Sequence, residues 1–346
     1  MLIENNINLK PYNTLQIPAI AKHFIKIQKE SDIFELMQTD LRKNEKHCIL
    51  NWGSNILFTQ NFDWIVVKIE TKWKNTVKSE NDKVLIEAMA WENWSDFVER
   101  CCENKYHWIE NLIDIPWNIG TSPVSNIWAY GNEVSNTIYE VEWIDLTTWE
   151  HKTFKKSECE FGYRTSIFKY KLKDKFLVTK VRFLLSIVNE NYTPNLWYID
   201  IQKYISETWI IPKTPKEISE IIREIRKNKL PDWHKIWTAW SFFSNPIISI
   251  KKREDLEKSF PDLSHHECID FDEKKIKLSA WQLIDLCWLK GWRIKNWTAW
   301  TYEKHALILI NIGWNANDVV EAMHHIQKCV KDKFWIILTP EVVLVN

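Results

Sequence analysis

The hydrophobic positions of the chain follow a helical period in some segments and form short runs in others. The helical period predicts helices. Apolar residues three and four apart are typical of one face of an amphipathic helix. The clearest case is TPKEISEIIREIRKNK (214–229), where Thr214 and Glu217 also carry the signature of a capping box. Another helix is predicted to begin near Ser31, a candidate N-cap residue. The helical segments predicted in this way are 31–43, 94–105, 214–229, 279–291 and 317–334.

Shorter apolar runs bounded by polar turn residues predict strands. One of them, CILNWGSNILF (48–58), is typical of a strand, a short loop and a second strand. Residues 109–135 are rich in loop-forming residues, and the chain shows no internal repeat. Helices and strands are therefore interspersed, which predicts an α+β fold. The other predicted strands are 62–70, 84–90, 138–146, 151–154, 176–187, 305–312 and 335–345.

Composition adds one anomaly to this pattern. The chain has 346 residues, with 22 Trp but only 6 Gly. An average protein of this length has about 24 Gly, because glycine makes up about 7% of residues. Chain reversals need glycine, since only glycine adopts positive φ without a Cβ penalty. Either the protein is unusually rich in tryptophan, or many Trp stand where glycine belongs.

The positions of the tryptophans favour the second interpretation. Trp52, Trp117 and Trp149 lie in the turn-like contexts NWGSN, IPWNIG and LTTWEHK. Trp94 differs, because it falls within a predicted amphipathic helix. We therefore interpret most of the Trp as UGA codons that the source reads as glycine. The alternative is a chain that is truly rich in tryptophan.

Charge and cysteine content exclude several classes of protein. The 46 basic and 46 acidic residues balance, which gives no indication of a nucleic-acid or membrane-surface partner. The seven cysteines form no C-x-x-C pair, as expected for a reduced, cytoplasmic chain. The N-terminus does not resemble a signal peptide, and no apolar run is long enough to span a bilayer.

General motifs do not define a reaction. The chain has no phosphate-binding P-loop, no G-x-G-x-x-G and no zinc-ligand spacing, and the His pairs 265–266 and 324–325 are typical of a surface. NWGSN is a candidate anion-binding loop, although such loops are also plain turns. Tyr163 and Arg164 could equally be a packed ring and a surface cation. Ser241 has no nucleophile elbow, and Glu341 has the pattern of a solvent-facing acid.

Seven motifs in order and spacing, however, resemble those of the UDP-N-acetylenolpyruvoylglucosamine reductase family. The resemblance runs from about Tyr12 to Val345. The motifs are YNTL (12–15), LNWGSNILF (50–58), ENLIDIPWNIGTSPVSNIWAYGNE (110–133), CEFGYRTSIFK (159–169), KLPDWHKIWTAWSFFSNP (229–246), AWQLIDLCWLKG (280–291) and TPEV (339–342).

This resemblance implies a fold and a division into domains. The family combines a two-subdomain FAD-binding fold of the vanillyl-alcohol-oxidase type with an α+β substrate-binding domain. The implied boundaries are 1–70 and 71–205 for the two FAD subdomains, 206–335 for the substrate domain, and 336–346 for a C-terminal strand that carries Glu341. The segment around NLWYIDI (195–201) is similar to the longer-loop type, in which Tyr198 would close over the uridine nucleotide.

The resemblance also implies a reaction. NADPH reduces FAD, and the reduced flavin transfers hydride to the enolpyruvyl group of the substrate. Tyr163 matches a tyrosine near the nicotinamide, while Arg164 and Glu341 match residues beside the developing enolate. Ser241 matches the proton donor. The implied substrate contacts are Tyr198, Lys229 and Asn245.

The same resemblance implies FAD contacts at Asn51, Trp52, Gly53, Ser54, Asn55, Trp117, Gly120, Thr121, Ser122, Pro123, Asn126, Ala129, Tyr130 and Gly131. It implies no metal and a monomer. Asn51 departs from the glycine that the family often has. The family commonly has glycine at Trp52, Trp64, Trp91, Trp108, Trp117, Trp128, Trp149, Trp237, Trp240, Trp288, Trp300, Trp314 and Trp335, and tryptophan at Trp94.

Two other interpretations stay open. The chain could be another flavin oxidoreductase of the same FAD fold, although the KLPD and SFF stretches belong to the family's substrate domain. It could also be a non-catalytic, Trp-rich binding protein whose indoles act as stacking platforms, although their turn-like contexts speak against this.

Overall fold

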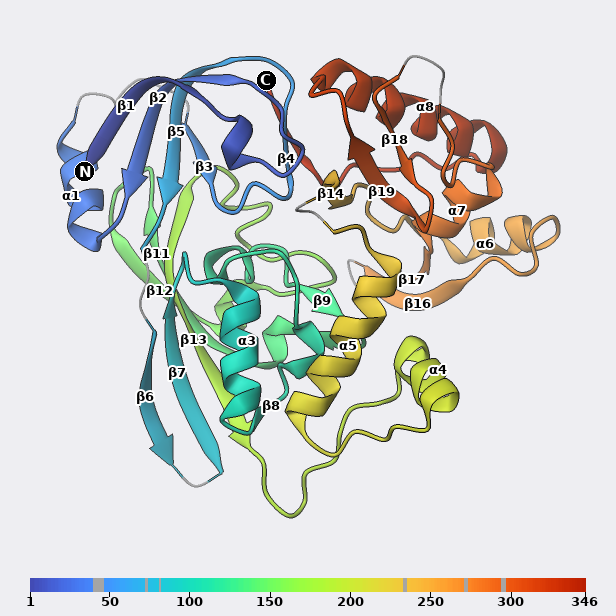
Figure 1. Ribbon diagram of the computed structural model, residues 1–346, viewed down its shortest axis with the longest axis horizontal. Helices are drawn as coiled ribbons and strands as arrows, with labels where there is room; N and C mark the ends of the chain where they lie inside the picture. The colour runs from blue at the N-terminus through green and yellow to red at the C-terminus, as the bar shows by residue number, and fades with distance from the viewer. Residues whose placement is uncertain (40–46, 72–73, 81, 233–234, 271–272, 294–296) are drawn as a thin grey trace. The chain divides into compact units, whose positions relative to one another are not determined.

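The computed structural model (Figure 1) describes residues 1–346 except 40–46, 72–73, 81, 233–234, 271–272 and 294–296. Trp73, Trp233 and the end of the first predicted helix lie outside the described residues. The chain divides into two compact units. Unit 1 comprises Met1–Ile7, Ala21–Trp52 and Asp63–Asn228, and unit 2 comprises Asn8–Ile20, Gly53–Phe62 and Lys229–Asn346.

Unit 1 is built on a four-stranded and a six-stranded sheet, with a short β-ribbon. The four-stranded sheet has the order β1 (Leu2–Asn8), β2 (Ile20–Ile27), β5 (Phe62–Ile69), β3 (His47–Leu50). The larger sheet has the order β12 (His151–Lys155), β11 (Ile138–Asp145), β13 (Phe176–Ile187), β7 (Lys83–Met89), β6 (Lys74–Glu80), with β8 (Tyr106–His107) paired to β13. The ribbon consists of β9 (Trp128–Ala129) and β10 (Asn132–Glu133).

Helix α3 (Trp94–Glu103) contributes its apolar face to the core of unit 1. Asn93 caps the helix by accepting a hydrogen bond from the Asp96 N–H at 3.0 Å. Trp94 is fully buried, and its indole N–H donates to the Leu112 carbonyl at 2.7 Å. A buried indole with a satisfied N–H is the environment that suits a genuine tryptophan.

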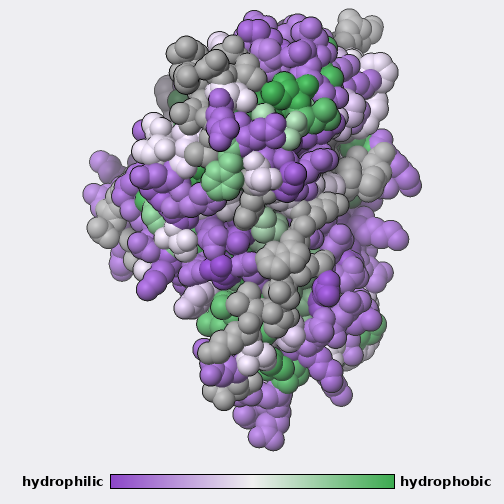
Figure 2. All heavy atoms as spheres, turned by 90° about the vertical axis from the view of Figure 1, so that its left-hand side faces the viewer, coloured by the Kyte–Doolittle hydropathy of each residue, from purple (hydrophilic) through white to green (hydrophobic). Residues whose placement is uncertain are grey.

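The opposite face of the six-stranded sheet carries charged side chains. The Arg182 guanidinium pairs with Glu87 at 2.6 Å and also with Glu140, while Lys180 pairs with Glu142 at 3.3 Å. Figure 2, which views the left-hand side of Figure 1, shows mostly hydrophilic residues among the coloured atoms on that side.

Unit 1 also contains α1 (Glu30–Gln38), α4 (Ile199–Thr208) and α5 (Pro215–Lys229), the last residue of α5 falling in unit 2. The predicted capping box of α5 is confirmed. The Glu217 N–H donates to Thr214 Oγ1 at 3.2 Å, and the Thr214 N–H donates to the Glu217 carboxylate at 3.2 Å.

The described part of unit 2 contains three small sheets. The first has the order β14 (Trp237–Ser241), β19 (His305–Asn311), β18 (Ala299–Tyr302). The second has the order β15 (Ile247–Ile248), β17 (Glu273–Leu278), β16 (His265–Asp270). In the third, β4 (Ile56–Phe58) pairs in parallel with β20 (Val343–Val345). Its helices are α6 (Ile250–Glu257), α7 (Ala280–Leu286) and α8 (Ala316–Phe334).

Two local predictions were wrong. Ser31 is not an N-cap, because α1 already begins at Glu30. The long C-terminal strand predicted over 335–345 is reduced to Val343–Val345. Ile336 and Leu338 are buried instead as alternate residues of an irregular segment, so their apolar pattern reflects packing without strand pairing.

Among the described residues, seven tryptophans have left-handed backbones, with φ between 50° and 82°: Trp108, Trp149, Trp209, Trp240, Trp288, Trp314 and Trp335. Six of them are among the predicted glycine positions, and Trp209 is an addition. Trp209 and Trp335 are the C-terminal caps of α4 and α8, where helices commonly end on glycine. For a bulky residue this conformation is an outlier, so the backbone supports glycine at these seven positions.

We expect glycine to stabilise the fold at Trp209, Trp288 and Trp335. These indoles are 87%, 86% and 79% exposed, so removing them sacrifices little burial. Each Trp→Gly substitution should raise the free energy of unfolding by about 1 kcal/mol, because the left-handed strain is relieved. Urea unfolding of the single variants measures this.

Trp94→Gly is the matched control in the same unfolding assay. It should lower the free energy of unfolding by about 3–5 kcal/mol, because it removes a fully buried ring. Equal destabilisation by all four substitutions would contradict the interpretation.

Candidate active site

The predicted cofactor loop connects β3 to β4. Gly53 has φ 74°, and a Cβ atom at this position would lie 2.0 Å from the Tyr12 carbonyl oxygen. The Thr14 N–H donates to the Gly53 carbonyl at 3.0 Å. The YNTL motif therefore holds the loop so closely that only glycine fits at position 53.

The end of this loop lies beside two predicted catalytic residues of unit 2. The Asn55 side-chain amide donates to the Glu341 carbonyl at 3.1 Å, and the Glu341 N–H donates to the Phe242 carbonyl at 2.8 Å. Phe242 directly follows Ser241. Asn55, Ser241 and Glu341 are thus brought together from three distant parts of the sequence.

A β-bulge precedes Ser241. The pairing of β14 with β19 shifts register between Thr238 and Ser241, and Trp240 within the shift has φ 50°. A bulge with one left-handed residue is the type that normally carries glycine, and bulges near active sites re-aim side chains. Position 240 is therefore a left-handed residue directly before Ser241, where glycine would suit the backbone.

The two predicted substrate contacts of unit 2 have different settings. Asn245 uses its side-chain oxygen to accept the Ala280 N–H at 2.9 Å, at the first residue of α7. This hydrogen bond ties the Asn245 side chain to the start of α7. Lys229 is the exposed last residue of α5.

The predicted cofactor segments of unit 1 contain buried polar atoms that fit a ligand rich in hydrogen-bonding groups. Among the described residues, Asn51 Oδ1, Asn118 Oδ1 and Thr121 Oγ1 have no hydrogen-bond partner. Buried polar atoms are normally satisfied, so such a group calls for an explanation. FAD carries donors and acceptors along its length, and these residues fit it.

Indoles crowd the same segments. The Trp52 and Trp91 rings lie 6.5 Å apart, and the Lys68 ammonium lies 3.7 Å from the centre of the Trp91 ring. Trp117 is 9% exposed. All three tryptophans stand at predicted glycine positions. The literal side chains therefore occupy space that glycine would leave to a cofactor.

Tyr198 packs against the other predicted cofactor loop. Its ring meets Tyr130 edge-on with centroids 5.3 Å apart, and Trp128 at 5.9 Å. Burial raises the pKa of Tyr198, and the charges of Asp200 and Tyr163 act in the same direction. Burial also raises the pKa of Tyr130 to about 12. These phenols are therefore neutral at physiological pH and act by packing and hydrogen bonding.

Tyr163 and Arg164 form a tight turn. Gly162 and Thr165 on either side of them pair through their backbones, and Arg164 has φ 53°. Asn126 from the cofactor loop donates to the Gly162 carbonyl at 3.0 Å and to Glu133 at 3.2 Å. Both amide protons of Asn126 are thus engaged by the protein, so a cofactor contact there would use the backbone.

Arg226 of α5 was missed by the sequence reasoning. Its guanidinium donates to the Asp114 carbonyl at 2.9 Å and is hydrogen-bonded to Tyr130. Burial lowers the pKa of Arg226, as does the nearby Arg164 charge. The one sequence signal for Arg226 is its place four residues after the buried Ile222, at the edge of the apolar face of α5.

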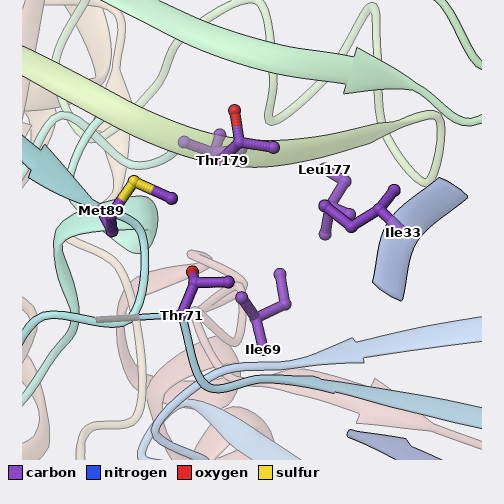
Figure 3. Close-up of a pocket in the computed structure, with 7 residues that line it drawn as sticks. Ile33, Ile69, Thr71, Met89, Leu177 and Thr179 are labelled. Atoms are coloured by element: carbon purple, nitrogen blue, oxygen red, sulfur yellow. The ribbon is translucent and has the colours of Figure 1, made fainter. Parts of the chain in front are cut away.

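A separate apolar pocket in unit 1 does not belong to this site. It is lined by Ile33, Ile69, Thr71, Met89, Leu177, Val178 and Thr179 (Figure 3), and it has no room for a water molecule. Within the described ranges, no three His, Cys, Asp or Glu side chains could hold a metal ion. No helix in the described part of the chain is long and apolar enough to cross a membrane.

Comparison with known proteins identifies the family. A family model described as "UDP-N-acetylenolpyruvoylglucosamine reductase, C-terminal domain" matches residues 232–345. The UDP-N-acetylenolpyruvoylglucosamine reductase of Flavobacterium johnsoniae is 37% identical over 99% of both chains. That of Chromobacterium violaceum is 35% identical over 97% of both.

A solved structure shows the same fold. UDP-N-acetylenolpyruvylglucosamine reductase from Thermus caldophilus matches with a TM-score of 0.67 and 19% identity, covering 100% of both chains. The predicted α+β fold is thereby confirmed. The protein is an FAD-dependent oxidoreductase. It belongs to the UDP-N-acetylenolpyruvoylglucosamine reductase family.

The bulge yields a prediction about position 240, tested in a chain that carries glycine at the other predicted positions. Compared with Trp240→Gly, both Trp240→Ala and the chain that retains Trp240 should reduce substrate at least about tenfold more slowly, because Ser241 is misdirected. Flavin content and bleaching of the flavin by NADPH should be the same in all three. Stopped-flow absorbance measures flavin reduction and substrate reduction separately. Equal losses in both rates would contradict the assignment of position 240 as the residue that directs Ser241.

Proposed function

We propose that the protein reduces UDP-N-acetylenolpyruvoylglucosamine to UDP-N-acetylmuramate with electrons from NADPH, as a cytoplasmic step of peptidoglycan precursor synthesis. The observation that carries this proposal is the grouping of Asn55, Ser241 and Glu341 in unit 2, in a chain similar to named reductases over its whole length. FAD supplies the hydride once it is bound and reduced. The remaining chemistry falls to the protein's side chains.

Arg164 would bind the carboxylate of the enolpyruvyl group. A guanidinium pairs with a carboxylate through two parallel hydrogen bonds and stays charged. It would also stabilise the negative charge that develops as hydride arrives, which is commonly a large catalytic contribution. Arg226 lies near enough to add to this positive potential.

Ser241 would deliver the proton that completes the reduction. An alcohol is a weak acid, so it needs a strongly basic enolate beside it, and this reaction provides one. The backbone of Glu341 is fixed on both sides, by Asn55 and by Phe242. Its carboxyl group would orient or donate to the same intermediate.

The other residues would hold the two ligands. FAD would be held by the loops 51–55, 117–123 and 126–131. Tyr163 would lie beside the nicotinamide, while Tyr198, Lys229 and Asn245 would bind the uridine nucleotide and its sugar. We also propose the division into FAD subdomains 1–70 and 71–205, a substrate domain 206–335 and a C-terminal segment 336–346, within a monomer.

Turnover tests the proposal directly. The chain expressed with glycine at the predicted positions should be yellow, with a flavin band at about 450 nm. It should oxidise NADPH only when UDP-N-acetylenolpyruvoylglucosamine is present. Oxidation of NADPH without that substrate would favour another flavin oxidoreductase, and a colourless, folded protein would favour a Trp-rich binding protein.

Ser241→Ala tests the assignment of the proton donor. Because general acid catalysis contributes about 10²–10⁴-fold, kcat should fall by at least about 10². Flavin reduction by NADPH should keep its rate, since Ser241 has no part in it. Ser244→Ala, three residues further along, is the matched control and should retain kcat.

A further inference from the structure

The turn that presents Arg164 holds this residue in a strained conformation. Gly162 and Thr165 exchange two backbone hydrogen bonds, of 3.1 and 3.3 Å, around Tyr163 and Arg164. Arg164, the second of the two central residues, has φ 53°. Turns with this backbone favour glycine there, because a Cβ atom makes the left-handed region costly.

Such a residue persists only where its surroundings enforce the conformation, and strain of this kind clusters at functional sites. Here two side chains hold the turn from outside. Asn126, which is 1% exposed, donates to the Gly162 carbonyl at 3.0 Å. The Lys169 ammonium donates a hydrogen bond to the Arg164 carbonyl at 2.9 Å.

The backbone of Lys169 is also held by hydrogen bonds. Its backbone N–H donates to the Ser166 carbonyl at 3.0 Å, and the buried Ser166 hydroxyl donates to the Val124 carbonyl at 2.8 Å. The short segment between Arg164 and Lys169 is thereby anchored to the loop around Val124, which precedes Asn126. The ammonium consequently reaches the Arg164 carbonyl from a rigid support.

We propose that Lys169 is a positioning residue for Arg164. Its ammonium neutralises the Arg164 carbonyl dipole and locks the left-handed turn, so that the guanidinium points in one direction before substrate binds. Lys169 acts through the backbone of Arg164 and does not touch the substrate. The proposal rests on the function assigned above to Arg164.

Lys169→Met tests this role in the chain that carries glycine at the predicted positions. It should lower kcat/KM for UDP-N-acetylenolpyruvoylglucosamine about tenfold, because small misplacements of a catalytic group have effects of this size. Flavin content and the rate of flavin bleaching by NADPH should stay within about twofold. Lys169→Arg should regain most of the activity, because a guanidinium can donate to the same carbonyl.

Lys171→Met is the matched control, because Lys171 pairs with Glu160 at 2.7 Å on the exposed side of the same segment. It should leave kcat/KM unchanged. The decisive comparison is a double-mutant cycle with Arg164→Ala, in which Lys169→Met should cause no further loss. An equal loss in the Arg164→Ala background, or an unchanged Lys169→Met enzyme, would overturn the proposal. An inactive parent enzyme would instead contradict the proposed function.

Discussion

The left-handed backbone is the constraint on which the rest of this structure depends. Seven of the tryptophans that the structure describes adopt it, with φ between 50° and 82°. An L-residue in this region brings its Cβ atom too close to the following carbonyl oxygen, and only glycine avoids the cost. Helices α4 and α8 end on such residues, and the strand that leads to Ser241 bends at one. The backbone is left-handed at these positions although the sequence has tryptophan there, and glycine is the residue that adopts this conformation without strain.

The same physics shapes the site. At Gly53 the chain passes so close to the Tyr12 carbonyl that a methyl group could not be placed. At position 240 a left-handed residue lies in the bulge of β14, directly before Ser241. Arg164, for which we propose a catalytic role, occupies the left-handed region itself, and hydrogen bonds from Asn126 and Lys169 hold its turn. Left-handed backbone therefore occurs at three places of the predicted site: at Gly53, directly before Ser241 and at Arg164.

Much of this was predictable from the sequence. The 3.6-residue period predicted α5 with its capping box, and short apolar runs predicted β7, β11 and β13, because both patterns follow from which residues are buried. The grouping of Asn55 with Glu341 followed only from the family resemblance, since no local pattern links residues 286 positions apart. The long C-terminal strand was wrong, because alternating burial at Ile336 and Leu338 occurs there without strand pairing.

Other features needed the structure. Arg226 was missed because a basic residue beside an apolar helix face is indistinguishable from a solvated one until its partners are known. Trp209 is absent from the predicted glycine positions because the family resemblance did not include it, whereas its left-handed backbone does support glycine there. Local sequence describes which residues are buried, but it does not describe the φ angle at a helix end.

The most direct test of the account is peptide mass spectrometry of the protein purified from its native cells. The account predicts that the C-terminal tryptic peptide beginning at Phe334 carries glycine at position 335, and that peptides covering positions 209, 240 and 288 do the same. The peptide containing position 94 should retain tryptophan. Tryptophan found at 209, 240, 288 and 335 would contradict the account.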